Sequence, residues 1–322
     1  MRTGIFAAAA MAVGLVASAA VAQDKWPSRP VTVIVPFAAG GNADVLARIY
    51  AERLSVRLGQ QFVIENKAGA GGTVGVAATV KSTPDGYTLG IATASGYATN
   101  PVIMKDKLSY NPEKDIIYLQ LMATQPNLLV LHPSVPAKTL PEFVAWVKAN
   151  PEQAYATSGI GSSQHLCGEM LIQLAGIKMN AVAYRASNQT MQDLIGGQIK
   201  IACDNFSTAW EQVKGGNVRA IAVTSPKRYS FAPDVPTFAE VYPGFEVLAS
   251  FGWIAPPGTP KSIVDKVIAE LDAIGREPDV LKRLAALSVE PSGITGDAFA
   301  ALARKEREMI APVVEKAGLK PQ

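Results

Sequence analysis

The chain has 322 residues, of which 48% are hydrophobic and 18% charged, and its formal net charge is +3. This length suits two domains of ordinary size, at about 150 residues each. The small net charge, without a run of lysine or arginine or a stripe of aromatic and basic residues, argues against a nucleic-acid-binding protein or one attracted to acidic membranes.

Residues 1–22 have the pattern of a cleaved signal peptide. Arg2 supplies a positive start, residues 5–17 are apolar, and residues 20–22 read Ala-Val-Ala, a small-x-small cleavage site. A membrane-anchoring helix is the alternative, but the apolar run is short, and no later stretch approaches the roughly 20 apolar residues of a membrane span. We expect an exported, soluble protein whose mature chain begins at Gln23.

Residues 31–48, VTVIVPFAAGGNADVLAR, predict a buried parallel strand, a glycine turn and a helix. Gly40 and Gly41 permit a sharp turn, and Asn42 or Asp44 is the expected helix cap. Backbone N–H groups would converge there at the positive end of a helix dipole. The turn therefore suits a carboxylate or another oxyanion, although an ordinary strand–helix turn explains this stretch equally well.

The next segments continue the strand–helix alternation. A strand over 62–65 precedes a glycine-rich loop at 66–72 and a helix over 73–82. The glycine spacing does not match GxGxxG, because valine stands where the third glycine is needed. A strand over 87–93 then ends in Thr93-Ala94-Ser95-Gly96, which places hydroxyl groups at a strand end where open parallel sheets collect ligands.

Two proline-rich passages resemble each other. Residues 132–140 follow a strand at 128–131, residues 253–263 begin with one, and each passage leads into an apolar helix. We interpret them as the chain leaving the first lobe and returning to it. Coincidence of common helix-start chemistry is the alternative.

The intervening residues form a second α/β pattern, in which strands are expected at 155–157, 181–184, 198–204 and 219–224. A Gly/Ser turn over 158–165 is the counterpart of the turn over 36–44. Tandem strand–helix alternation predicts parallel sheets. The last stretch, 300–316, predicts a charged amphipathic helix packed on the first lobe.

Cys167 and Cys203 are the only cysteines. They could pair in an oxidising compartment, but separate buried thiols are the favoured interpretation, and the pairing stays open. Two cysteines and two distant histidines do not have metal-site spacing, so no metal is expected.

Ser162, Ser163 and His165 suggest a nucleophile, but there is no G-x-S-x-G elbow and no evident acid to orient the histidine. Walker, HExxH and paired-carboxylate patterns are also missing from the sequence. We therefore expect no catalytic residue and no cofactor, and a secreted hydrolase remains a minor alternative.

Taken in order, the motifs resemble the Bug family of periplasmic solute-binding proteins, the extracytoplasmic receptors of tripartite tricarboxylate transporters. The resemblance covers nearly the whole mature chain and rests on WPSRP, PFAAGGNAD, ENKAGAGG, PDGYTL, SGIGSSQHL, LIGGQI, PDVPTFAEVYPGFE and GWIAPPGTP. It implies a two-lobed α/β fold of the type II flytrap class, with a parallel-rich sheet in each lobe and an interlobe ligand cleft. The first lobe would comprise 23–126 plus 251–322, and the second 127–250.

The resemblance also implies a small carboxylate ligand, such as a dicarboxylate or an aromatic acid, which is bound and not altered. The partners would be the membrane permease subunits of a tripartite tricarboxylate transporter, and the protein would be a periplasmic monomer. A ligand sensor for a membrane signalling partner is the alternative. By position, the expected ligand-binding residues are Phe37, Gly41, Asn42, Asp44, Thr93, Ser95, Ser158, Gly161, Ser162, Ser163, His165, Asp204 and Asn205.

The sequence departs from the family pattern where the far end of the ligand would lie. Residues 185–190, Lys200 and Asn205 replace residue types usual in the family. The ligand specificity of a relative is therefore not expected to apply to this chain. Arg185 or Arg228 could meet a second acid group, with a solvated charge or an ion pair within the lobe as the alternative.

Overall fold

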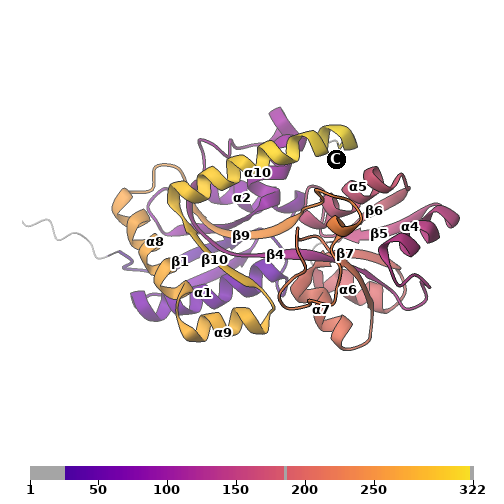
Figure 1. Cartoon of the computed structure of the whole chain (residues 1–322). Helices are drawn as coiled ribbons and strands as arrows, with labels where there is room; N and C mark the ends of the chain where they lie inside the picture. The colour runs from indigo at the N-terminus through magenta and orange to yellow at the C-terminus, as the bar shows by residue number, and fades with distance from the viewer. Residues whose placement is uncertain (1–25, 185–186, 320–322) are drawn as a thin grey trace, which may run out of the picture.

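The computed structural model describes residues 26–184 and 187–319, so the expected signal peptide and Arg185 lie outside the described residues. The protein has two lobes, each with helices packed around a β-sheet (Figure 1). The mixed α/β, two-lobed fold predicted from the sequence is confirmed.

The sheet of the first lobe begins with parallel strands and ends with antiparallel ones. Strand β1 (Val31–Val35) lies between β2 (Phe62–Asn66) and β3 (Thr88–Thr93), and both pairings are parallel. Strand β9 (Leu248–Ala255) pairs antiparallel with β3 and with β4 (Ile117–Leu131). The predicted parallel pairing is thus present in β1, β2 and β3, whereas the antiparallel strands were not predicted. They arise because strands that cross between the lobes in opposite directions lie side by side.

The sheet of the second lobe is built on the far end of β4. Strand β7 (Ile201–Asn205) pairs antiparallel with β4 and parallel with β5 (Gln153–Thr157), which pairs in turn with β6 (Met179–Ala183). Strand β8 (Arg219–Val223) also pairs with β4. The parallel strands end facing the gap between the lobes, where ligands collect in open α/β sheets.

Strands β4 and β9 connect the lobes. Residues 117–126 of β4 pair with β9, and residues 127–131 pair with β7. Pro126, which has no N–H to donate, lies at the change of partner. The sequence predicted only the last four residues of β4, because its central part alternates poorly, and only the end of β9.

Helices cover both faces of the sheets, and β10 (Glu290–Thr295) adds an antiparallel edge to β4. The helices of the first lobe are α1 (Asn42–Leu58), α2 (Thr73–Val80), α3 (Asn100–Met104), α8 (Lys261–Gly275), α9 (Pro278–Ala286) and α10 (Gly296–Ala317). Those of the second lobe are α4 (Leu140–Ala149), α5 (Ser163–Ala175), α6 (Ser187–Ile195) and α7 (Phe206–Lys214).

Helix α10 packs on the first lobe, as predicted, and also reaches the second. Phe299 lies edge-on against Tyr97 and Tyr118, with ring centroids 5.5 and 4.9 Å away. Near the other end of the helix, Gln173 Nε2 of α5 donates to the Val313 carbonyl at 3.4 Å. Figure 1 shows α10 in yellow running along the first lobe toward α5.

Cys167 on α5 and Cys203 on β7 form a disulfide, with their Cα atoms 6.4 Å apart. The favoured interpretation of two separate thiols was wrong, because α5 packs across β7 and brings together side chains that are 36 positions apart in the chain. The sequence carries no signal of this packing.

Removal of the disulfide should destabilise the second lobe. Closing a loop of this length is expected to contribute about 3 kcal/mol to the free energy of unfolding. We expect Cys167→Ala/Cys203→Ala, and wild type with dithiothreitol, to unfold at lower urea concentration than oxidised wild type. The double variant should not respond to dithiothreitol; a wild type equally insensitive to it would contradict the prediction.

Candidate functional site

The starts of two helices, one from each lobe, line a single cavity of about 40 Å³. Gly41 and Asn42 open α1, whereas Ser162 and Ser163 open α5. The first N–H groups of a helix have no partner within it, and both helix dipoles direct positive potential into this space. The cavity therefore favours an oxyanion.

The turn before α1 is fixed by a carboxylate that lies behind the cavity. Asp44 accepts from the Gly40 N–H at 2.9 Å, from Asn66 Nδ2 at 2.9 Å and from Arg48 at 2.9 Å. Burial opposes the Asp44 charge, but these hydrogen bonds outweigh it and lower the pKa of that carboxyl. Neither Asn42 nor Asp44 caps the helix as predicted; the cap position is Gly41, which has no side chain to accept from the first turn of α1.

Donors from the first lobe complete one wall of the cavity. Thr93 and Ser95, at the end of β3, hydrogen-bond to each other through their hydroxyls at 2.7 Å. Asn42 Oδ1 accepts from Thr208 Oγ1 across the lobes at 3.0 Å, while Asn42 Nδ2 is buried and has no hydrogen-bond partner among the residues that the structure describes. That amide nitrogen is a donor available to a bound anion.

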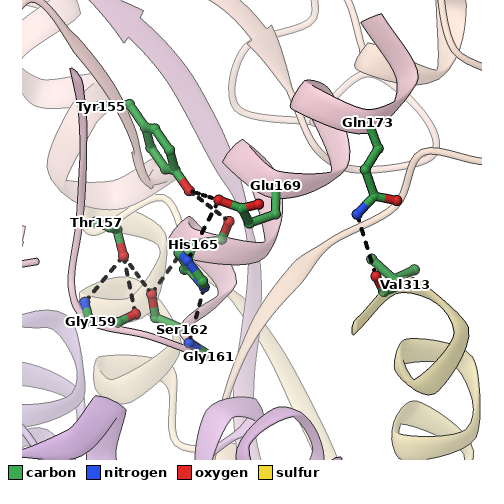
Figure 2. A network of polar contacts seen from close by, with 9 residues as sticks. All are labelled: Tyr155, Thr157, Gly159, Gly161, Ser162, His165, Glu169, Gln173 and Val313. Atoms are coloured by element: carbon green, nitrogen blue, oxygen red, sulfur yellow. Dashed lines mark hydrogen bonds and ion pairs between the residues drawn. The ribbon is translucent and has the colours of Figure 1, made fainter. Parts of the chain in front are cut away.

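The turn before α5 is held by its own hydrogen bonds (Figure 2). Ser162 Oγ accepts from the His165 N–H at 3.2 Å and shares a hydrogen bond of 3.0 Å with Thr157 Oγ1. Gly161 has φ of 76°, a conformation that favours glycine, and its N–H donates to His165 Nδ1 at 3.3 Å. The histidine ring thus accepts a backbone proton, and its side chain does not pair with the Ser162 hydroxyl, so these residues do not form a nucleophile–base pair.

His165 does not line the cavity; its ring lies beside Glu169 and Tyr155 (Figure 2). Its Nε2 lies 3.7 Å from Glu169 Oε1, which accepts from the Tyr155 hydroxyl at 2.9 Å. Burial lowers the pKa of His165 to about 4 and raises the pKa of Glu169. The imidazole is therefore neutral at pH 7, and this contact is not an ion pair there.

A second buried carboxylate, Asp204, lies behind the other wall of the cavity. It is 1% exposed and contacts Gln164, Ser187 and Asn205, all of which line the cavity. Burial raises its pKa to about 7. Unlike Asp44, it has no cationic partner among these contacts.

The structure brings together most of the predicted ligand-binding residues. Those that line the cavity are Phe37, Gly41, Asn42, Thr93, Ser95, Ser158, Ser162, Ser163 and Asn205. Asp44, Gly161, His165 and Asp204 lie behind it and hold its walls. Arg228 forms a two-pronged ion pair with Glu240 on the surface, so for this residue the alternative of an ion pair within the lobe is confirmed.

Some lining residues were missed by the sequence analysis: Ala43, Ala94, Gln164, Ser187, Ala249, Ser250 and Phe251. Gln164 belongs to the same Gly/Ser turn as Ser162 and offered a signal. Ser250 and its neighbours lie on β9. They reach the cavity wall only because β9 crosses from one lobe to the other.

A larger chamber of about 520 Å³ adjoins the small cavity and shares Phe37 and Ser158 with it. The lobes touch at its edge, where a Cβ on Gly71 would lie 2.1 Å from the Ile160 carbonyl oxygen. Glycine therefore permits direct contact between the two backbones. This contact and the Asn42–Thr208 hydrogen bond join the lobes across the cleft.

The described residues contain neither a membrane-spanning helix nor a metal-binding cluster. None of their helices combines the length and the apolar character needed to cross a bilayer. Likewise, no group of three or more His, Cys, Asp or Glu side chains in that part of the chain could hold a metal ion.

Comparison with known proteins identifies relatives over most of the chain. The family model described as "Tripartite tricarboxylate transporter family receptor" matches residues 46–319. The structure of the periplasmic binding protein BugD is similar, with a TM-score of 0.87 and 36% identity, covering 92% of this chain and 100% of BugD.

Two similar structures from Rhodopseudomonas palustris contain dicarboxylates. One is Rpa4515 with adipate, with a TM-score of 0.88 and 32% identity over 92% of this chain and 100% of that one. The other is MatC with bound malate, with a TM-score of 0.84 and 32% identity over 90% of this chain and 100% of that one.

Neutral His165 should make stability depend on pH. Its folded pKa of about 4 lies below the ordinary value of 6.5, so the unfolded chain takes up the proton first and stability falls as the pH drops from 6.5 to 4. We expect wild type to lose up to about 3 kcal/mol relative to His165→Gln across this range, measured by urea unfolding. His132→Gln, outside this network, is the control; a constant difference between wild type and His165→Gln would contradict the assignment.

Proposed function

The chain belongs to the tripartite tricarboxylate transporter receptor family, and from this membership we propose that it binds a small carboxylate in the periplasm and delivers it to a membrane permease. The lobes would be residues 23–126 plus 251–322, and residues 127–250. One observation carries the proposal: the starts of α1 and α5 meet in a cavity whose size suits a carboxylate group.

The proposed binding uses partial charges and hydrogen-bond donors. Each helix start carries about half a positive charge, and the N–H groups of the first turn of α1 have no side-chain cap. Asn42 Nδ2 and the Ser95 hydroxyl would donate to the remaining lone pairs. No lysine or arginine of the described residues lines the cavity, so these donors would hold the carboxylate there.

Closure of the lobes would couple binding to recognition by the permease. The donors come from both lobes, so they surround one carboxylate only when the cleft is shut, and the ligand would favour that state. The crossing of β4 and β9 is the connection about which the lobes would move. A permease that contacts both lobes would then distinguish the loaded receptor from the empty one.

The similar proteins support a dicarboxylate as the first candidate ligand, because their structures hold adipate and malate. In the proposed arrangement one carboxylate occupies the small cavity. The rest of the molecule extends past Phe37 and Ser158 into the larger chamber, which those residues also line.

A thermal-shift screen tests the proposal directly. We expect a mono-, di- or tricarboxylate to raise the unfolding temperature, with adipate and malate tested first. At a ligand concentration one hundred times the dissociation constant, binding adds about 2.7 kcal/mol to the free energy of unfolding. 1,6-Hexanediol, which matches adipate in length but lacks its charge, should have no effect; a panel of acids without any response would overturn the proposal.

Ser95→Ala should weaken binding of the acid found in that screen by about fivefold, because one hydrogen bond worth about 1 kcal/mol is lost. Isothermal titration calorimetry measures the change. Ser134→Ala, an exposed serine remote from the cavity, is the matched control. Equal affinities for Ser95→Ala and wild type would remove Ser95 from the proposed site.

A further inference from the structure

Gln164 stands between the buried Asp204 and the hydroxyls of the proposed carboxylate site. Its Nε2 donates to Asp204 Oδ1 and to Ser187 Oγ, both at 3.4 Å. Its Oε1 accepts from Ser158 Oγ at 2.9 Å and from Ser163 Oγ at 3.4 Å. One amide therefore links the carboxyl group to two lining serines.

An amide has donors at one end and only acceptors at the other, so its orientation dictates what its neighbours do. In the orientation observed, the Ser158 hydroxyl donates its single hydrogen to Gln164 Oε1. Only its lone pairs are then available to the cavity. A ligand carboxylate also presents only lone pairs. In the observed orientation the Ser158 hydroxyl therefore cannot donate a hydrogen bond to the proposed ligand.

We propose that Asp204 is a positioning residue that, through the orientation of the Gln164 amide, determines whether Ser158 offers a hydrogen or a lone pair to a bound carboxylate. The inference rests on the proposed function for its ligand. It concerns a residue that does not line the cavity and acts only through its neighbour.

The opposite orientation requires a proton on Asp204. The Asp204 carboxylate takes up this proton from solvent, keeps it, and donates a hydrogen bond to Gln164 Oε1, which now stands where Nε2 stood. Nε2 then donates to Ser158 Oγ, and the Ser158 hydrogen turns to the cavity. Ser163 is affected less, because its hydroxyl already has a second acceptor, Asn127 Oδ1, at 3.2 Å.

The surroundings of Asp204 favour its taking up a proton. Among the described residues, the groups that face it are the Gln164 amide from α5, the Ser187 hydroxyl from α6 and the adjoining Asn205 N–H at 2.6 Å. None of these carries a charge, and within the described ranges Asp204 Oδ2 is buried without a hydrogen-bond partner. Its pKa of about 7 means that Asp204 gains or loses its proton near neutral pH. A carboxylate in the cavity would raise that pKa further.

Nuclear magnetic resonance of the free protein tests the link without a ligand. The Cγ shift of Asp204 and the side-chain amide shifts of Gln164 are followed from pH 5 to pH 9. We expect the two to change with one midpoint, and the Gln164 transition to disappear in Asp204→Asn. Gln164 shifts that stay constant while Asp204 titrates, or an Asp204 that does not titrate in this range, would overturn the proposal.

Binding measurements test the consequence for the site, with adipate and malate as probes. We expect the affinity of wild type to fall about tenfold from pH 6 to pH 8, with proton uptake detected by calorimetry in buffers of different ionisation enthalpy. Asp204→Asn, whose amide can donate to Gln164 as the acid form does, should keep the high affinity at both pH values. Asp204→Leu has no side-chain donor for Gln164 Oε1 and no acceptor for Gln164 Nε2. This variant should bind the two acids weakly at both pH values.

Glu306→Gln is the matched control, because Glu306 is another carboxyl whose pKa burial raises to about 7, and it contacts Ser250 on a different wall. This variant should retain the wild-type pH dependence. Binding equally strong at pH 6 and pH 8 in wild type refutes the role of Asp204 and leaves the proposed function standing. Failure of every acid to bind refutes the proposed function, while the magnetic resonance titration still decides the link between Asp204 and Gln164.

Discussion

Two helix starts from opposite lobes share one small cavity, and the rest of the structure serves to hold them there. Repulsion between two electropositive helix ends has to be offset by the framework that carries them. Strands β4 and β9 supply that framework, because each belongs to the connection between the lobes and they pair with each other over most of the length of β9. The disulfide between α5 and β7 adds a covalent tie directly behind one of the two helix starts.

The carboxylates behind the cavity divide into two kinds. Asp44 is fixed by an arginine, an amide and a backbone N–H, so its charge is satisfied and the turn before α1 stays in one conformation. Asp204 is equally buried, but the groups that face it from the described part of the chain are all neutral. A rigid wall on the first lobe thus faces a wall on the second lobe whose hydrogen-bond polarity can change. Such an arrangement keeps the anchor for the acid group constant while the opposite wall responds to the bound molecule.

The local chemistry of the turns was predictable from the sequence. Strand β1 was predicted with its observed ends, and the glycine turn that follows it was predicted because β-branched runs, proline and paired glycines act over a few residues. The same holds for the Gly/Ser turn before α5. The antiparallel strands were predicted poorly, because strand direction depends on how the chain crosses between lobes and not on residue type.

The sequence by itself determined the α/β class, the two turns and the chemical character of the site, since these follow from residue type and spacing. Only the tertiary structure decided which polar residues face the cavity and which stand behind it. Ser158 and His165 belong to the same turn, yet one lines the cavity and the other is buried against Glu169. The pairing of Cys167 with Cys203, the place of Ser250 and the contact of Asp204 with Gln164 were decided in the same way. The physical reason is that burial and partner choice depend on elements distant in the chain, whereas propensity depends on neighbours.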